Sequence, residues 1–232
     1  MPISSHSLNH RMPGATHPAE LARAVVARYA GSPRFTRSYV GGKLRHDPAS
    51  AAILGLGADR HLGAVVDLGC GRGQLGLALL LAGAATSIIG LERDAAKLAE
   101  AARAAEGLPA RFLPADLVHA AVPPGDTLLL VDVLYQLPEA AQRRLLALAA
   151  AAARRRVLVR AFDPDRGWRS ALGLAMERAG RALRRDGAAV RPLPPAALAA
   201  PLRAAGFTVY VEPCWGRTPL PNVLLVAERA AA

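Results

Sequence analysis

Cysteine is scarce in this chain, with only Cys70 and Cys214 among 232 residues. This number excludes a disulfide-stapled scaffold and every multi-cysteine zinc site. Aromatic residues make up only 4% of the chain, which argues against a main role in stacking single-stranded nucleic acid. Clustered acids suited to a magnesium site are also missing, and we expect no metal ion.

The chain also lacks a clean apolar run of membrane-spanning length. The longest uncharged stretch, 73–91, is interrupted by Gly83, Gly90 and an Ala-Thr-Ser break, which is typical of a helix, a turn and a buried strand. Residues 1–17 are polar and lack the apolar core of a signal peptide, so we expect a flexible tail. We therefore expect a cytoplasmic protein.

Lysine is nearly absent too, since all but two of the 29 basic residues are arginine. The charge of residues 1–139 is almost balanced, with 13 basic and 12 acidic side chains. Residues 140–232 carry 16 basic and 6 acidic side chains. A one-sided basic surface favours an anionic partner. Nucleic acid, anionic lipid and an acidic protein all remain open.

Hydrophobic residues make up 52% of the chain, enough for a sizeable core. Short apolar runs alternate with helical periodicity, which predicts an α/β fold with a mostly parallel sheet covered on both faces. The expected strands are 64–68, 87–91, 110–113, 127–133 and 156–161. The expected helices are 18–30, 48–56, 74–82, 94–105, 138–153 and 195–205, followed by a closing hairpin at 207–212 and 223–228.

This order predicts a single domain over residues 18–232, with a helical N-terminal lid at 18–56 and a helical insertion at 163–190. Within the insertion, six residues recur at helical spacing and form one apolar stripe: Trp168, Leu172, Ala175, Met176, Ala179 and Leu183. Such a helix can cover the sheet, act as a substrate lid, touch a membrane surface or dock an acidic carrier protein.

The glycine-rich segment from Val65 to Gly73 is the most informative part of the sequence. A buried strand runs into three glycines and then opens a helix at Gln74, so the turn lies at the carboxyl edge of the sheet, where ligands bind. Gly71, Gly73 and Gly76 fit the dinucleotide fingerprint, which alone is a weak signal. The alternative register, D-x-G-x-G-x-G, begins at Asp67 and places this acid at the strand tip.

The second register resembles the first motif of class I S-adenosylmethionine-dependent methyltransferases, and we favour it. The resemblance extends to an acid after the fourth strand (Asp132, followed by Tyr135), as in the small-molecule branch, and to the Leu-x-x-Ala-Gly-Phe turn at 202–207. It implies a Rossmann-like doubly wound sheet with a reversed last strand, and S-adenosylmethionine as cofactor. The cofactor-binding residues that it implies are Asp67, Gly69, Cys70, Gly71, Gly73, Glu92, Arg93, Asp116, Leu117 and Asp132.

Two of these acids have expected roles. Glu92 ends the second strand about 20 residues after the loop, where a carboxylate can accept hydrogen bonds from both ribose hydroxyls. In the family, the acid at the position of Asp116 accepts from the adenine amino group, and the next backbone N–H meets the ring. A strand-end acid in solvent and a helix cap are the plainer alternatives.

The acceptor is less constrained. The absence of Asn-Pro-Pro-Tyr and Pro-Cys after the fourth strand argues against methylation of DNA bases. We expect a small-molecule or carrier-bound acceptor, lipid- or polyketide-like, contacted by Tyr39, Tyr135 and Trp168. Tyr135, His46 and, less directly, His119 are candidates for a general base. RNA methylation, a non-catalytic cofactor-binding protein and an NAD-dependent protein are the alternatives, and the basic insertion also allows peripheral membrane contact.

Overall fold

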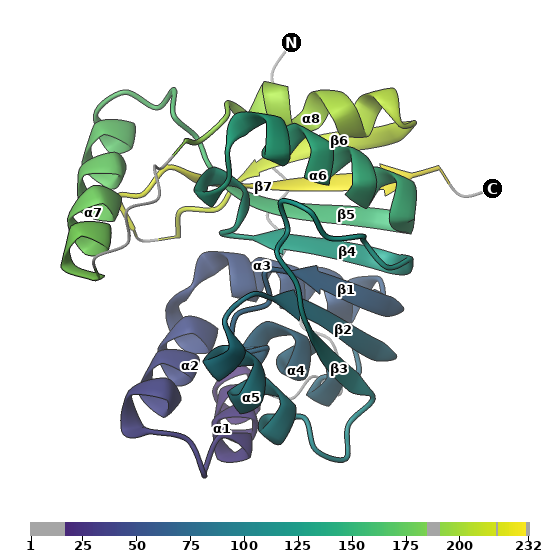
Figure 1. The fold of residues 1–232 in the computed structure, drawn as a ribbon, viewed down its shortest axis with the longest axis vertical. Helices are drawn as coiled ribbons and strands as arrows, with labels where there is room; N and C mark the ends of the chain where they lie inside the picture. Colours follow the sequence, from purple (N-terminus) through teal and green to yellow (C-terminus); the bar gives the residue numbers. More distant parts are fainter. Residues whose placement is uncertain (1–16, 185–190, 217, 231–232) are drawn as a thin grey trace.

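The computed structural model describes residues 17–184, 191–216 and 218–230. Its centre is a seven-stranded sheet in the order β3-β2-β1-β4-β5-β7-β6 (Figure 1). Every neighbouring pair is parallel except β5–β7 and β6–β7, so β7 alone runs in reverse. The doubly wound sheet with a reversed last strand is thereby confirmed. The expected tail, except residue 17, and residues 185–190 of the expected insertion lie outside the described residues.

The apolar runs of the sequence form the strands. Their bounds are Ala64–Leu68 for β1, Ser87–Glu92 for β2, Ala110–Pro114 for β3, Gly125–Val131 for β4, Ala153–Phe162 for β5, Phe207–Pro213 for β6 and Asn222–Arg229 for β7. The central strands β1, β4 and β5 are buried along most of their length, as expected for a sheet that helices cover on both faces.

The helical stretches form two layers. Their bounds are Pro18–Arg28 for α1, Arg34–His46 for α2, Pro48–Asp59 for α3, Gln74–Leu81 for α4, Ala95–Ala104 for α5, Glu139–Ala152 for α6, Trp168–Arg184 for α7 and Pro195–Ala204 for α8, with a short 3₁₀ turn η1 at Leu134–Gln136. None of the helices in the described ranges is long and apolar enough to cross a membrane.

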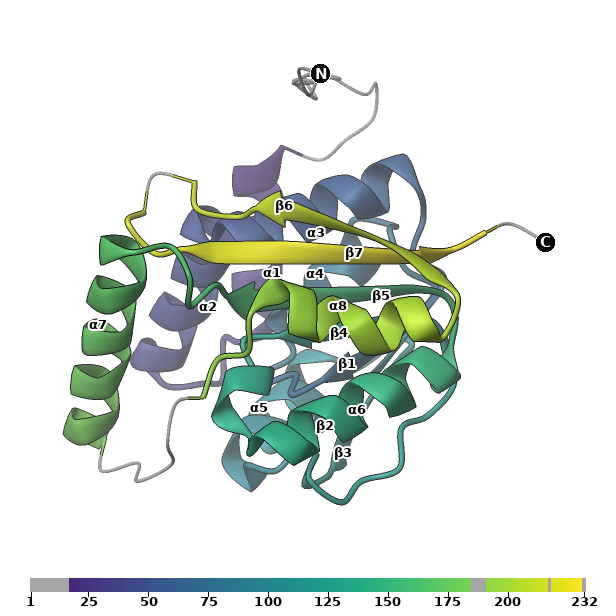
Figure 2. The ribbon, with the colours of Figure 1, turned by 90° about the horizontal axis from the view of Figure 1, so that it is seen from above.

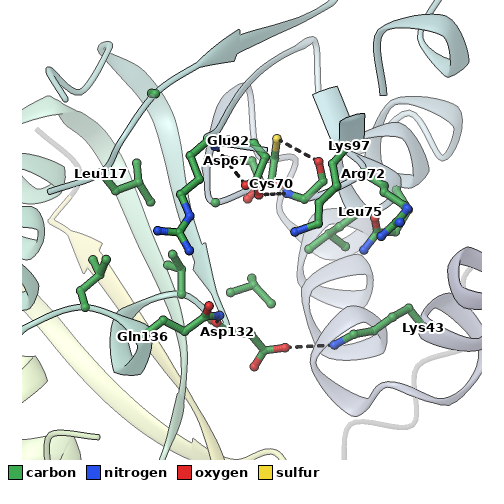
Figure 3. Close-up of a pocket in the computed structure, with 18 of the residues that line it drawn as sticks. Lys43, Asp67, Cys70, Arg72, Leu75, Glu92, Lys97, Leu117, Asp132 and Gln136 are labelled. Atoms are coloured by element: carbon green, nitrogen blue, oxygen red, sulfur yellow. Dashed lines mark hydrogen bonds and ion pairs between the residues drawn. The ribbon is translucent and has the colours of Figure 1, made fainter. Parts of the chain in front are cut away.

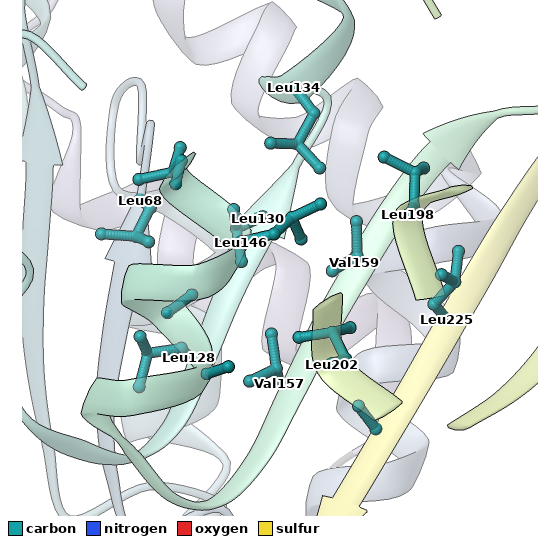
Figure 4. Close-up of a cluster of buried hydrophobic side chains, with 14 of the residues drawn as sticks. Leu68, Leu128, Leu130, Leu134, Leu146, Val157, Val159, Leu198, Leu202 and Leu225 are labelled. Carbon is teal, nitrogen blue, oxygen red and sulfur yellow. The ribbon is translucent and has the colours of Figure 1, made fainter. Parts of the chain in front are cut away.

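The main core lies between the sheet and the pair α6 and α8 (Figure 4). Leu146 of α6 and Leu202 of α8 are fully buried there against Leu128 and Val157 of the sheet. A second cluster fills the opposite face, where α3 and α4 pack on β1 and β2. A third cluster joins α1 and α2 to α4, so the N-terminal helices are an integral layer of the fold.

The segment Arg34–His46, within the expected helical lid, is a continuous helix although it contains paired glycines. A Cβ at Gly41 would lie 3.3 Å from Val26, so α1 and α2 approach closely at this glycine. Strand β4 ends at Val131 rather than at residue 133, because Asp132 has a left-handed backbone (φ 60°) that cannot continue a strand.

Helix α7 stands beside the carboxyl ends of the strands, at the same end of the molecule as α2 (Figure 2). The first half of its apolar stripe does not cover the sheet: Trp168 is 66% exposed, Leu172 39% and Met176 52%. The buried residues of this part of the helix are Ser170 and Gly173, on the opposite side. The interpretation of this stripe as a cover for the sheet is therefore wrong for these residues.

Candidate cofactor and acceptor pocket

A pocket of about 410 Å³ opens at the carboxyl ends of β1, β2 and β4 (Figure 3). Its walls come from the glycine loop after β1, the end of β2, the segment after β3, the turn after β4 and, from the N-terminal layer, α2 and α3. This size is within the range of small-molecule sites, and the location is the usual one in open α/β sheets.

The glycine loop gives the pocket a wall of bare backbone. Gly69, Gly71 and Gly73 all have positive φ, of 82°, 57° and 74°. The N–H groups of Gly69 and Cys70 both donate to the carbonyl of Leu91, which ties the loop to β2. A Cβ at Gly71 would meet no protein atom within 4 Å, whereas one at Gly73 would lie 2.6 Å from the ring of Phe112. Gly71 thus leaves space that a ligand can use, and Gly73 allows tight packing.

Glu92 connects this loop to the start of α5. Its Oε2 accepts from the Gly71 N–H at 3.1 Å, and its Oε1 accepts from the N–H groups of Arg93 and Asp94, both at 3.0 Å. Each carboxylate oxygen can accept more than one hydrogen bond, so Glu92 can hold the loop and still receive hydroxyl groups from a ligand.

Asp67 lies on the floor of the pocket, within β1 and next to its last residue, and is 3% exposed. Burial, reinforced by the negative charge of Glu92, raises the pKa of Asp67 from 3.8 to about 7. A carboxyl group with a pKa in this range changes its charge near neutral pH, and a positively charged ligand would favour the ionised form.

Asp116 follows β3 and is exposed at the rim of the pocket. One oxygen of the Asp116 carboxylate accepts a hydrogen bond from the Val118 N–H at 3.0 Å, so the local turn already uses part of the capacity of this carboxylate to accept hydrogen bonds. The neighbouring Leu117 is buried and also lines the pocket. No helix begins at Asp116, so the helix-cap alternative is wrong; Asp116 closes a turn and lines the pocket.

The turn after β4 is held by two cations. Lys43 Nζ on α2 lies 3.0 Å from Asp132 Oδ2, and an Arg160 Nη1–H donates to the same oxygen. Arg160 Nη2 lies 3.5 Å from Asp47 Oδ1, and Lys43 Nζ lies 3.7 Å from Asp47 Oδ2. Ser50 donates its hydroxyl to Asp47 at 2.9 Å. We call Lys43, Asp47, Asp132 and Arg160 the charge cluster.

The charges of this cluster balance. Burial disfavours the charged forms of Lys43 and Arg160, but the attraction of Asp132 and Asp47 more than offsets it and raises the pKa of both cations. Both therefore stay charged, and Lys43 is unsuited to act as a base at neutral pH. The cluster joins α2 and the start of α3 to the ends of β4 and β5, across one side of the pocket.

Arg72 ties the other side of the pocket to α2. Its Nε donates to Glu100 Oε2 at 2.7 Å, and its guanidinium lies 5.3 Å from the ring centre of Tyr39 and 6.0 Å from that of Phe35. The buried Tyr29 donates its hydroxyl to the Arg72 carbonyl. The N-terminal helices are thus fixed to the glycine loop itself, and Tyr39 lines the pocket.

Nine of the ten cofactor-binding residues expected from the sequence line this one pocket, and Gly73 instead packs behind the loop. The acceptor and base candidates are less concentrated. Tyr39 lines the pocket, whereas His46 and His119 are exposed. Tyr135 is half-buried in η1 and close enough to Arg160 to affect its pKa, and Trp168 is exposed on α7.

The sequence analysis did not single out the partners of Asp132. Lys43 and Asp47 are only four residues apart, but Asp132 and Arg160 come from strand ends far from them in the chain, so no spacing rule connects the two halves of the cluster. The signal that could have pointed to Lys43 is its rarity, because only one other residue is a lysine.

The pocket suits a polar, elongated ligand. The first turn of α4 has no side-chain cap, so its backbone N–H groups remain available to a ligand. The buried Oε1 of Gln74, which also lines the pocket, has no hydrogen-bond partner among the described residues. With Glu92, Asp116 and the bare backbone at Gly71, these groups fit a ligand that carries hydroxyl and amino donors together with an anionic group.

Comparisons with known proteins agree with this geometry. Residues 65–156, which include the glycine loop and the turn after β4, match the family model described as "Methyltransferase domain". No curated protein sequence matches the chain at a significant level.

Three solved structures illustrate the similarity. Magnesium protoporphyrin IX methyltransferase from Synechocystis PCC 6803, with bound SAH, is 23% identical with a TM-score of 0.62, and the alignment covers 90% of this chain and 94% of that one. An O-methyltransferase family protein from Burkholderia thailandensis is 20% identical with a TM-score of 0.64, covering 89% and 63%. An S-adenosylmethionine-dependent methyltransferase from Mesorhizobium loti is 19% identical with a TM-score of 0.61, covering 78% and 96%.

Proposed function

We propose, since residues 65–156 match a methyltransferase domain, that this chain is a class I, S-adenosylmethionine-dependent methyltransferase and that it methylates a small organic acceptor that meets the cofactor between α2 and the turn after β4. The observation that carries the proposal is the single pocket in which the glycine loop, Glu92, Asp116 and Asp132 meet. The nicotinamide alternative is set aside, because the matched domain is that of a methyltransferase.

The cofactor-side residues have distinct tasks in this proposal. Glu92 receives the two ribose hydroxyls while it holds the Gly71 N–H, and Asp116 with the Leu117 backbone frames the adenine. The glycine loop and the uncapped start of α4 offer N–H donors to the anionic end of the cofactor. Asp67 contributes a carboxyl group that can ionise beside the positive charge.

When bound, S-adenosylmethionine supplies a methyl group on a positively charged sulfur, which the acceptor takes in an in-line displacement. The protein residues therefore act mainly by alignment, and few dedicated catalytic groups are needed. Lys43 and Arg160 contribute by fixing the turn at Asp132, which forms the wall next to the acceptor space. If the acceptor is a hydroxyl, Tyr135 or His46 is proposed as the base that accepts its proton.

We further propose that the acceptor is largely apolar, whether free or bound to a carrier as lipid or polyketide chains are. Tyr39, Tyr135 and Trp168 remain the proposed acceptor contacts. Aromatic side chains gather at the pocket's end of the molecule, where Phe35 is 72% and Tyr39 39% exposed on α2. RNA as acceptor stays the second candidate, because residues 140–232 carry 16 basic and 6 acidic side chains. Peripheral association with a membrane also stays a proposal.

Parallel calorimetric titrations with S-adenosylmethionine, its demethylated product and NADH test the cofactor assignment. Micromolar binding of the first two and none of NADH is the expected result. Binding of NADH alone would overturn the assignment. Methyl transfer to RNA whose binding weakens steeply with added salt would replace the small-molecule acceptor by the RNA alternative.

A further inference from the structure

Helix α7 presents an apolar stripe away from the body of the protein. Trp168, Leu172 and Met176 follow one another at intervals of four residues, which places them on one side of the helix, and all three are exposed. A helix that only covered a core would point this stripe inward. The exposed stripe is therefore available to a partner outside the folded domain.

The opposite side of α7 is fixed to the domain. A Cβ at Gly173 would lie 2.4 Å from the ring of Phe162, so the helix packs closely on the end of β5. Ser170 donates its hydroxyl to the Asp163 carbonyl at 2.8 Å and accepts from the Arg166 N–H at 2.9 Å. The outward direction of the stripe is therefore set by contacts on the far side of the helix.

Helix α2 lies at the same end of the molecule as α7. Both views of the molecule place α2 and α7 at the end where the pocket opens (Figures 1 and 2). On α2, Phe35 is 72% exposed and its neighbour Arg34 is exposed as well. We call the outer faces of α2 and α7, with Arg34, Phe35, Trp168, Leu172 and Met176, the α2–α7 end.

The charged side chains that the structure describes on these two helices are all cationic. Arg34 and Arg45 of α2 are exposed, Lys43 of α2 is paired within the charge cluster, and Arg169 lies in the first turn of α7. Neither α2 nor residues 168–176 of α7 include an acid. The guanidinium of Arg169 lies over the ring of Trp168, 5.2 Å from the ring centre, so a cation and an exposed aromatic side chain lie next to each other. Apolar and aromatic side chains beside arginines are the composition of a helix that lies in the interface of an anionic bilayer.

We propose that the α2–α7 end docks on the surface of an anionic lipid bilayer, with the stripe of α7 inserted at the level of the headgroups and the arginines paired with lipid phosphates. This contact places the pocket mouth next to the membrane, so the acceptor reaches the site from the lipid phase. The docking goes beyond methyl transfer and can be measured without any methyl donor.

Co-sedimentation of the full chain with vesicles tests the docking. We expect binding to vesicles that contain phosphatidylglycerol and much weaker binding to pure phosphatidylcholine. The partition coefficient of the triple variant Trp168→Ser, Leu172→Ser, Met176→Ser is expected to fall at least about tenfold. Each of the three apolar side chains gains free energy when it moves from water into the bilayer, and the variant loses this gain. The matched control, Tyr210→Ser with Val211→Ser, removes exposed apolar residues from the edge strand β6 and should bind as the unmodified chain does.

Fluorescence gives a second measurement that does not depend on the triple variant. The chain has two tryptophans, and the buried indole nitrogen of Trp215 has no hydrogen-bond partner among the described residues, so Trp215→Phe leaves Trp168 as sole reporter without loss of a hydrogen bond. Phosphatidylglycerol vesicles should shift its emission to shorter wavelength and shield it from acrylamide.

Three outcomes would overturn the proposal. These are equal vesicle binding by the triple variant and the unmodified chain, no change in Trp168 emission, and binding of polyglutamate through the stripe without any binding to vesicles. The last would assign the surface to an acidic protein. Calorimetry with S-adenosylmethionine on the same samples keeps a failure of the docking separate from a failure of the proposed function.

Discussion

Lys43 on α2 forms an ion pair with Asp132, the residue that follows β4, with 3.0 Å between Nζ and Oδ2. Asp132 has a left-handed backbone, which costs a non-glycine residue about 1–2 kcal/mol. The ion pairs with Lys43 and Arg160 offset that cost. The pair thus fixes both the N-terminal layer and the turn that borders the acceptor space.

A double-mutant cycle measures this pairing. Lys43→Met and Asp132→Asn each remove one charge, and Asn tolerates the left-handed backbone about as well as Asp. We expect the two changes in the free energy of unfolding to be non-additive by about 1–2 kcal/mol, since each side chain is about three-quarters buried. Denaturant unfolding of the four proteins gives the coupling, and strict additivity would show that the pair contributes nothing.

Glu92→Ala is expected to weaken S-adenosylmethionine binding by about 2 kcal/mol, the scale of lost hydrogen bonds to a charged group. The same change frees the Gly71 N–H, so part of the loss would come from the loop. Calorimetry on Glu92→Ala and on Glu139→Ala, an exposed glutamate of α6, provides the comparison. Unchanged affinity in a folded Glu92→Ala protein would remove Glu92 from the site.

Gly71→Ala and Gly73→Ala should separate binding from folding. Both positions have positive φ, so each alanine costs about 1–2 kcal/mol of stability. At Gly73 the new methyl group also collides with Phe112, which adds about 1–3 kcal/mol. At Gly71 the methyl group meets no protein atom but occupies space at the pocket.

We therefore expect Gly73→Ala to lower the free energy of unfolding more, and Gly71→Ala to lower cofactor affinity more at equal folded fraction. Thermal unfolding and calorimetry on both variants check the order. The reverse order in either measurement would contradict the placement of these two glycines.

Asp67 should make the protein less stable as pH rises. The unfolded chain loses this proton near pH 3.8, whereas the folded chain keeps it up to about pH 7, so the folded state binds the extra proton between these values. The contribution of Asp67 to the free energy of unfolding therefore decreases as the pH rises from 3.8 to about 7, and it stays at the lower value above that pH. Asp67→Asn mimics the neutral carboxyl group.

The free energy of unfolding of the Asp67→Asn variant is expected to equal that of the unmodified chain near pH 4 and to exceed it at pH 8 by about 4 kcal/mol at most. Denaturant unfolding across this pH range measures the difference. Asp59→Asn, at an exposed position at the end of α3, should show no such trend. A stability difference that does not change with pH would mean that Asp67 is already ionised in the folded state at pH 4.

Both thiols should be inert in the folded protein. Burial raises the pKa of Cys214 to about 11 and raises that of Cys70 as well, so neither is a thiolate at pH 8. A chromogenic thiol reagent should react with both only as the chain unfolds. Rapid reaction of one thiol in the native protein would place it in an open site.

Sequence reasoning was most successful where a signal is local. The glycine loop, the acid at the end of β2 and the start of α3 at Pro48 are each contained within a few residues, and the structure has the loop, the strand end and the helix start where they were expected. The expected reversed strand also follows from a short hairpin pattern.

Non-local features could not be predicted in this way. The charge cluster joins Asp47 to Arg160 through the fold alone, and no periodicity links them. Helix α2 has little intrinsic propensity because of Gly41 and Gly42, and close packing against α1 stabilises it. The exposed stripe of α7 has the same pattern as a buried one, so only the structure shows which way it faces.

The charge cluster also has a consequence for synthesis of the chain. Asp47 and Lys43 leave the ribosome long before Arg160, and the carboxylate of Asp47 has its full set of partners only after β5 has been made. The nascent N-terminal helices therefore lack the α4 and α5 side chains that pack on Val25 and Val40 until α5 has been made, and they lack the ion pair with Arg160 until β5 follows. A ribosome that pauses before residue 160 would hold a chain whose glycine loop is complete but whose acceptor wall is not yet closed.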